Sequence, residues 1–144
     1  MPETIAIASD HAGVTLKETL KDQLLALGFL PEDMGAFAKD SVDYPDYAHL
    51  VSKWIVAQPA RRGVLICGSG IGMSIAANRH KGVRAALCRT VEDAGLARTH
   101  NNANVLCLGE RSTDAETAKE ILKHFLATPF DGGRHETRVN KMDK

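Results

Sequence analysis

Apolar and polar positions alternate along this chain in two ways, and the two patterns follow one another regularly. Short apolar runs, typical of buried strands, are separated by longer segments in which apolar residues recur every three or four positions, as in amphipathic helices. Because Pro31 interrupts the second run, that strand is the weakest. Strands that alternate with helices predict βαβ units and a parallel sheet. The apolar runs predict five strands, at residues 4–9, 29–34, 64–67, 83–88 and 105–108.

The helical segments between these runs have recognisable ends. The last has the most regular apolar face, and Asp114 is placed to cap its N-terminus. Gly28 suits the position after the first helix, and Pro59 ends the second. A polar tail, residues 131–144, is a candidate for a further short helix that contributes to a site or to a dimer. The predicted helices cover residues 16–27, 47–55, 73–78, 90–98 and 115–126.

The order of these elements indicates an α/β protein of the flavodoxin-like, doubly wound class. Right-handed crossovers place helices on both faces of a parallel sheet, and five strands fit the order 2-1-3-4-5 of that class. The chain has 144 residues without an internal repeat, low-complexity tract or linker, so we expect a single domain over residues 1–144. A chain of this length buries about two-thirds of its unfolded surface, which is enough for a full core.

Charge and cysteine content narrow the class of protein. Lys and Arg together number 18, as do Asp and Glu, so there is no overall basic field that would bind nucleic acid or an anionic membrane. The three cysteines lie far apart, which argues against a disulfide scaffold. With no signal peptide and no long apolar run, we expect a cytoplasmic protein without a membrane segment. Zero net charge also removes one barrier to self-association.

The segment of residues 63–73 (GVLICGSGIGM) carries the strongest chemical signal. A buried strand ends at Cys67, passes through a glycine-rich turn and enters a helix. Ligands bind at this edge of open α/β sheets, a turn into a helix favours anions, and a thiol there tends to have a lowered pKa. We therefore predict a base or nucleophile beside an oxyanion site. The alternatives are a ligand-free turn and a small buried side chain, which is how we interpret Cys88 and Cys107.

Other reactive side chains gather in three short stretches. Residues 9–11 follow the first strand, so they can meet the Cys67 turn at one sheet edge. His100 precedes the fifth strand and is expected toward the opposite edge, unless it serves a neighbouring subunit. Arg134 and Arg138 lie four residues apart and either clamp a phosphate or form a solvated tail. The remaining histidines have no spacing that suits a metal, and no metal or cofactor is predicted.

Six motifs taken together resemble the type B ribose-5-phosphate isomerases, a family that includes the galactose-6-phosphate isomerase subunits. The resemblance covers nearly the whole chain, in order. It implies a metal-free and cofactor-free aldose–ketose isomerisation of a phosphorylated sugar through a cis-enediolate. The motifs are residues 9–13 (SDHAG), 43–45 (DYP), 67–72 (CGSGIG), 75–78 (IAAN), 100–104 (HNNAN) and 132–135 (GGRH).

The resemblance also implies roles for individual residues. Cys67 corresponds to the general base, and Ser69 to a hydroxyl that helps protons move between O1 and O2. His100, with Asp10, corresponds to the residues that open the furanose ring. One branch of the family uses a glutamate where this chain has Met73, which leaves Cys67 as the base. The implied substrate-binding residues are His11, Tyr44, Gly68, Gly70, Ile71, Gly72, Asn101, Arg111, Arg134 and Arg138.

From this resemblance we expect interconversion of ribose 5-phosphate and ribulose 5-phosphate in the pentose phosphate pathway. Sites of the family are shared between subunits, with the His100 segment crossing from the partner, which implies a homodimer or a dimer of dimers. The alternatives are isomerisation of another sugar phosphate, such as allose 6-phosphate, galactose 6-phosphate or a tetrulose phosphate, and a non-catalytic phosphate- or nucleotide-binding module. Neither nucleic acid nor a membrane is an expected partner.

Overall fold

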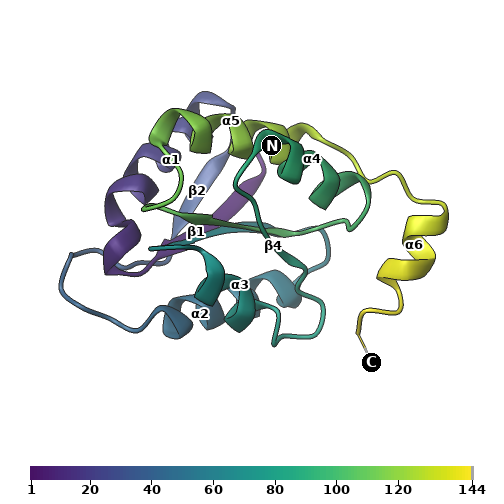
Figure 1. The fold of residues 1–144 in the computed structure, drawn as a ribbon, viewed down its shortest axis with the longest axis horizontal. Coiled ribbons are helices and arrows are strands. Elements are labelled where there is room, and N and C mark those ends of the chain that lie inside the picture. Colours follow the sequence, from purple (N-terminus) through teal and green to yellow (C-terminus); the bar gives the residue numbers. More distant parts are fainter. Residues whose placement is uncertain (144) are drawn as a thin grey trace.

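Five parallel strands form one sheet within residues 1–143, the part of the chain that the computed structural model describes (Figure 1). All five expected strands are present, and each lies within two residues or so of its predicted position. Lys144, the end of the expected domain and tail, lies outside the described residues. The strands are β1 (Thr4–Ser9), β2 (Leu30–Asp33), β3 (Arg62–Cys67), β4 (Ala85–Leu87) and β5 (Val105–Gly109).

Helices cover both faces of this sheet, as expected for a doubly wound fold (Figure 1). The first, fourth and fifth helices pack on one face, and the second and third pack on the other. A short 3-10 turn, His11–Gly13, precedes the first helix. The helices are α1 (Val14–Ala26), α2 (Tyr44–Ala57), α3 (Ile71–Ala77), α4 (Val91–Thr99), α5 (Ala115–Ala127) and α6 (Arg134–Val139).

The strand order is β2-β1-β3-β5-β4, which differs from the expected 2-1-3-4-5 at one edge. The doubly wound, five-stranded parallel class is confirmed, but β5 lies between β3 and β4 and pairs with both. The position of α4 explains this. A right-handed crossover that steps back toward β3 must place its helix on the same face as α1. The buried Ala94 and Ala97 of α4 do pack in the α1 layer.

Local sequence signals account for the ends of the main helices. The Gly28 N–H donates to Leu25 O at 3.1 Å and the Phe29 N–H donates to Leu24 O at 2.9 Å, which is the Schellman arrangement. Gly28 adopts the required positive φ of +91°. At the start of α5 the Asp114 side chain accepts from the Thr117 N–H, as predicted. These two ends follow directly from residue type.

The central strand β3 directs Cys67 toward one helix layer. Its side chains alternate, so that Val64 and Ile66 pack with α1, α4 and α5, while Leu65 and Cys67 pack with α2 and α3. All four are buried, because a strand in a parallel sheet is covered on both faces. Cys67 is the last residue of β3, and its sulfur therefore lies at the carboxyl edge of the sheet, beside the start of α3.

The two weakest sequence signals gave short elements at the margins. β2 contains Pro31 and lies at the edge of the sheet, where a missing N–H can be tolerated. The polar tail forms α6, which begins after Gly132 and Gly133 and has no buried residue. In Figure 1 this helix stands at one side of the molecule, away from the sheet. Among the helices of residues 1–143, none combines the length and the apolar character needed to cross a lipid bilayer.

Candidate active site

A hollow of about 570 Å³ opens at the carboxyl edge of the sheet, above the ends of β1 and β3. We call it the Cys67 hollow. Its position agrees with the rule that ligands bind outside the carboxyl ends of parallel strands. Eight of its ten lining residues belong to the predicted site, so the topology does bring these segments together. The hollow is lined by Asp10, Tyr44, Cys67, Gly68, Ser69, Ile71, Gly72, Ile75, Arg111 and Ser112.

Cys67 differs from the other two cysteines in its surroundings. Its side chain is only 5% exposed, yet it lines the hollow, and its Sγ accepts a hydrogen bond from the Gly70 N–H at 3.2 Å. Cys88 and Cys107 are buried in the two helix–sheet cores. Burial raises the pKa of Cys88 to about 12, and it raises the pKa of Cys107 as well. Their interpretation as small buried side chains is confirmed.

The turn after Cys67 depends on Gly70. This residue has a φ of +80°, and a Cβ there would lie 2.6 Å from Leu87 Cδ1 and 2.9 Å from the Leu108 carbonyl carbon. Only glycine fits such a position without strain. The turn leads directly into α3, where no acceptor within residues 1–143 takes the N–H groups of Gly72 and Met73. Met73 is fully buried, so of these two amides only that of Gly72, which lines the hollow, can be reached by a ligand. The oxyanion site stays a prediction.

Tyr44 and Arg111 approach the same turn from α2 and from the loop after β5. A Cβ on Gly72 would lie 2.6 Å from the Tyr44 ring, and a Cβ on Gly68 would lie 2.8 Å from Arg111 Nη1. The Arg111 N–H also donates to Gly68 O at 3.0 Å. Both glycines therefore make room for a neighbouring side chain, and the phenol and the guanidinium lie at either side of the turn.

Asp10 and His11 follow β1 and reach this edge as expected. Asp10 is 6% exposed, and one of its carboxylate oxygens accepts from the Ala12 N–H at 3.0 Å, which caps the short 3-10 turn. His11 Nδ1 accepts from the Val42 N–H at 3.2 Å. Since Nδ1 is an acceptor, the neutral ring carries its proton on Nε2, which is then free to donate to a ligand.

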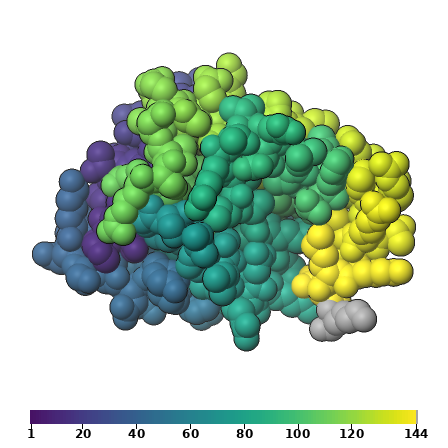
Figure 2. Space-filling model, viewed as in Figure 1, coloured from purple at the N-terminus to yellow at the C-terminus, as the bar shows by residue number. Residues whose placement is uncertain are grey.

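Four predicted site residues lie elsewhere. His100 is the C-cap of α4, and the loop after it reaches the start of β3, where the Gly63 N–H donates to Asn104 O. His100 and Asn101 thus lie toward the amino edge, as the position of His100 before the fifth strand predicted. Arg134 and Arg138 belong to α6, which lies along one side of the molecule (Figure 2, yellow). Within one chain, none of these four lines the Cys67 hollow as described for residues 1–143.

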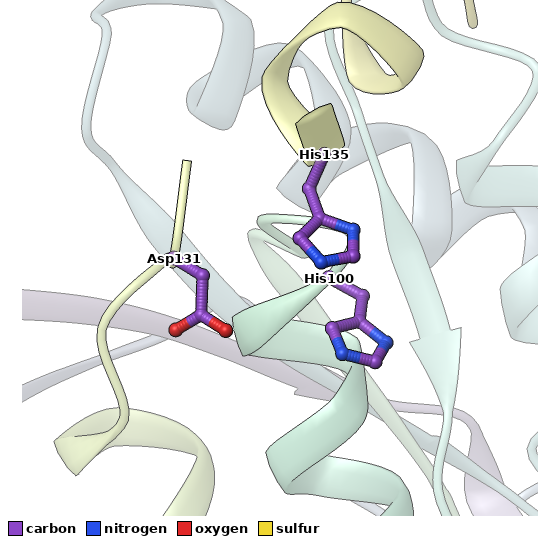
Figure 3. Close-up of side chains that lie close together, drawn as sticks. All are labelled: His100, Asp131 and His135. Carbon is purple, nitrogen blue, oxygen red and sulfur yellow. The ribbon is translucent and has the colours of Figure 1, made fainter. Parts of the chain in front are cut away.

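A second cluster of side chains forms around His100 and includes two residues that the sequence analysis did not assign. His135 of α6 stacks on His100, with ring centroids 4.3 Å apart and an interplanar angle of 12°, and Asp131 lies beside them (Figure 3). Burial lowers the pKa of His135, and the charges of His100, Arg134 and Arg138 lower it further. Only the GGRH motif hinted at His135, and nothing in the sequence indicated Asp131.

The same cluster contains ligand types that bind divalent metals. The ligand atoms of His100, Asp131 and His135 lie within 4.8 Å of one another. However, the two rings are nearly parallel, so their in-plane nitrogen lone pairs run side by side and do not converge on one point. This geometry favours a stacked imidazole pair over a chelate. The expectation that the site uses no metal stays a prediction.

The chain is similar to known isomerases over nearly its whole length. A family model described as Ribose/Galactose Isomerase matches residues 5–142. A putative sugar phosphate isomerase of Bacillus subtilis, YwlF, is 47% identical over 139 residues, which are 96% of this chain and 93% of the relative. Ribose-5-phosphate isomerase B of Escherichia coli is 40% identical over 138 residues, with the same coverage of the two chains.

Solved structures show the same similarity in three dimensions. A ribose 5-phosphate isomerase from Thermotoga maritima superposes with a TM-score of 0.95 at 55% identity, over 98% of this chain and 97% of that one. The type B ribose 5-phosphate isomerase of Trypanosoma brucei gives a TM-score of 0.95 at 44% identity, over 99% and 97% of the two chains. Fold and family membership therefore rest on agreement along the whole chain.

Proposed function

This chain belongs to the ribose/galactose isomerase family, and on that premise we propose that it interconverts ribose 5-phosphate and ribulose 5-phosphate. One observation carries the proposal. Of the three cysteines, Cys67 lines the Cys67 hollow, and it does so beside the unpaired Gly72 amide at the start of α3. Simple phosphate binding does not require a thiol there, whereas proton transfer between neighbouring carbons requires a base.

The proposed reaction moves one proton between C1 and C2 of the open-chain sugar. The Cys67 thiolate removes the proton from C2 of the aldose, and the electron pair passes to the carbonyl oxygen at C1 to give an enediolate. A proton then moves from O2 to O1, which the Ser69 hydroxyl can relay. Cys67 returns its proton to C1, and the carbonyl group is now at C2. No electron acceptor is needed, because the sugar is oxidised at C2 and reduced at C1.

The expected sizes of the two catalytic effects, oxyanion stabilisation and proton transfer by a base, support this mechanism. A C–H bond next to a carbonyl is a weak acid, so most of the barrier reflects the charge that develops on oxygen. Each preorganised donor at that oxygen can contribute about 3–4 kcal/mol, and a positioned base contributes about 10²–10⁴-fold in rate. We assign the first effect to the Gly72 amide, which lines the hollow without an acceptor in residues 1–143, and the second to Cys67.

We further propose that two copies of the chain share each site. Arg111 is the one cationic side chain among the residues that line the Cys67 hollow, which is little for a phosphate dianion. His100, Asn101, Arg134 and Arg138 would complete the site if a second copy presented its amino edge. The rim of the hollow supports this, because Ile71 and Ile75 are 44% and 61% exposed and would be covered.

Isomerase assays with a panel of sugar phosphates, in the presence of a chelator, test the activity. We expect ribose 5-phosphate to give the highest kcat/KM among pentose, hexose and tetrose phosphates. A higher kcat/KM for allose 6-phosphate or galactose 6-phosphate would show that the proposed substrate is wrong, while the proposed isomerisation would stand. Binding of every sugar without exchange of the C2 proton with solvent would instead support a non-catalytic binding module.

Complementation tests the shared site. Cys67→Ala and Arg138→Ala damage the two halves that we propose come from different chains. The two variants are unfolded together, refolded and assayed at a substrate concentration so low that Arg138→Ala alone is nearly inactive. Random pairing then gives mixed dimers in half of the cases, and each has one intact site of two. About one quarter of the wild-type activity should return. If no activity returns although mixed dimers are detected by mass spectrometry, the sites are not shared.

A further inference from the structure

A second hollow, of about 580 Å³, lies at the amino edge of the sheet, remote from Cys67. We call it the arginine hollow, because Arg61, Arg62, Arg84 and Arg98 line it. These residues come from the start of β3, the turn before β4 and the end of α4, so only the fold brings them together. The net charge of the chain is zero, and this concentration of guanidinium groups is therefore a local feature.

The carboxylate of Glu3, which lines this hollow, is already paired with one of the four arginines. Glu3 binds Arg62 through both oxygens, at 2.7 Å from Nη2 and 2.9 Å from Nε. The other three arginines form no ion pair within residues 1–143. The nearby Asp143 acts on Arg84 only through its field, and its carboxylate accepts from the Gly82 N–H. Three guanidinium groups thus share a hollow without a paired counter-charge.

Neutral acceptors hold these three guanidinium groups. Arg84 Nε donates to Asn102 O at 2.8 Å. Arg98 donates from Nη1 to the Asn102 side chain, at 2.9 Å, and to Ala103 O, at 2.7 Å, and from Nε to Thr128 O, at 3.1 Å. Arg61 donates to Trp54 O at 2.9 Å, and its guanidinium lies 4.2 Å from the centre of the Trp54 ring. These contacts leave Nη2 of Arg61, Arg84 and Arg98 without an acceptor within residues 1–143.

This arrangement is electrostatically costly without an anion. Arg98 is only 9% exposed, and buried charges are normally paired. Burial lowers the pKa of Arg98, and the positive charges of Arg62 and Arg84 lower it further, although Glu3 acts in the opposite direction. Burial also lowers the pKa of Arg84. A bound anion would remove this repulsion.

We propose that the arginine hollow binds the phosphate group of a small molecule, at a site separate from the Cys67 hollow. Planar guanidinium groups bind phosphate oxygens in pairs, and several of them around one hollow suit a dianion better than a carboxylate. The volume lies within the range of small-molecule sites, about 300–1,000 Å³. Inorganic phosphate and a phosphate ester share this chemistry, and the experiment below separates them.

Such a ligand would act on the loop that carries His100. Asn102 adopts a positive φ of +47°, and Arg84 and Arg98 bind its main chain and its side chain. Because Asn102 is two residues from His100, an anion that draws these arginines together also fixes the position of the loop. Binding itself does not depend on the proposed isomerase activity, whereas an effect on turnover does rest on it.

Trp54, the one tryptophan of the chain, gives a direct readout because it contacts Arg61. Inorganic phosphate and ribose 5-phosphate are titrated separately into the full-length protein at constant ionic strength, and Trp54 fluorescence is recorded. We expect a saturable change. Equal midpoints for the two ligands would indicate a site for inorganic phosphate, and a midpoint at least about tenfold lower for the ester would indicate a site for a phosphorylated metabolite.

Variants locate the response. Arg84→Gln should raise the midpoint about tenfold or more, as expected for the loss of a charged hydrogen bond. Arg79→Gln removes the same charge from an exposed residue outside the hollow and should leave the midpoint unchanged. Arg138→Ala, in the proposed substrate site, should also leave it unchanged, so the outcome is independent of isomerase activity. A linear response, or equal effects of Arg84→Gln and Arg79→Gln, overturns the proposal.

Nuclear magnetic resonance keeps the test decisive if Arg84→Gln does not fold. In the wild-type protein, phosphate should shift the Nε–H resonances of Arg84 and Arg98 with the same midpoint as the fluorescence change. Arg61→Gln, on the surface of the hollow, should raise that midpoint severalfold. If phosphate shifts only resonances around Arg111 and the Cys67 turn, the protein has no anion site at the amino edge.

Discussion

The two edges of the sheet differ in the kinds of residue that form them. At the carboxyl edge, glycines allow main chain, a thiol and a phenol to pack closely, and Arg111 is the one cation that lines the Cys67 hollow. At the amino edge, guanidinium groups surround an open hollow, and the neighbouring loop carries His100 and Asn101. Close packing of the main chain is therefore found at the carboxyl edge, and the concentration of positive charge is found at the amino edge. One edge suits chemistry on a carbon skeleton, and the other suits the binding of anions.

The largest expected effect tests whether the carboxyl edge alone supplies the base. Cys67→Ala should lower kcat by about 10²–10⁴-fold or more, because the proposed proton transfer loses its base. Cys88→Ala is the matched control, since it removes the same sulfur from a buried position outside the hollow. Steady-state assays of both variants give the comparison. Full activity of Cys67→Ala would remove this residue from the mechanism.

The next largest effect compares Arg111, which lines the Cys67 hollow, with Arg138, which lies on α6. Arg111→Ala and Arg138→Ala should each raise KM for a sugar phosphate by about 10–100-fold, because each is proposed to contribute a charged hydrogen bond to phosphate. Arg79→Ala is the control, because it lowers the net charge equally at an exposed position. An unchanged KM for Arg138→Ala would mean that the α6 side of the molecule does not contact substrate, which would weaken the shared site.

Stability should reveal the difference in packing between the two edges. Gly70→Ala should destabilise the fold by about 2–4 kcal/mol, because it adds a strained positive φ to contacts with Leu87 and Leu108. Gly82 also has a positive φ, of +90°, but a Cβ there would have Val56 Cγ1 as its neighbour, at 3.4 Å. Gly82→Ala should cost only about 1 kcal/mol. Urea denaturation measures both values, and equal losses would contradict the contrast.

The smallest effect is a pH dependence at the amino edge. Burial lowers the pKa of His80, and the charges of His49 and Lys53 lower it further. Above the pKa of the unfolded chain both states are neutral, and the contribution to stability is fully present. As the pH falls through that value, the unfolded chain takes up a proton that the folded chain resists, so stability decreases. Histidine in an unfolded chain titrates near pH 6.5.

His80→Gln should therefore flatten the decline in stability between about pH 7 and pH 5. His124→Gln, on an exposed part of α5, is the matched control. Thermal unfolding across this pH range measures the slope for each variant. If the wild-type slope persists in His80→Gln, the acid sensitivity arises elsewhere in the molecule.

The sequence predicted the elements of the fold better than their arrangement at one edge. Apolar runs and capping residues such as Gly28 and Asp114 act locally, so the strands and the main helix ends followed from residue type. The exchange of β4 and β5 did not. It depends on which face α4 covers, and the small side chains of Ala94 and Ala97 mark no broad apolar stripe from which that face could be read.

The site shows the same division between local and distant information. Residues that follow strands, such as Asp10 and Cys67, could be placed because the carboxyl ends of parallel strands share one edge. The cluster of His100, Asp131 and His135 could not, because it forms only where the chain returns after α5. The arginine hollow could not be predicted for another reason. The net charge of zero is a sum over the whole chain and does not show that positive charges gather at one place on the fold.

Helix α4 runs from the carboxyl edge of the sheet to the amino edge, and its length therefore fixes the position of His100. It runs nine residues, from its cap at Thr90 to His100, and the buried Ala94 and Ala97 fix its rotation on the sheet. One inserted or deleted residue would turn His100 by about 100° and displace it by about 1.5 Å along the axis. Surface loops can lengthen or shorten during evolution, but the length of this helix should not vary among proteins that use His100 in the same way.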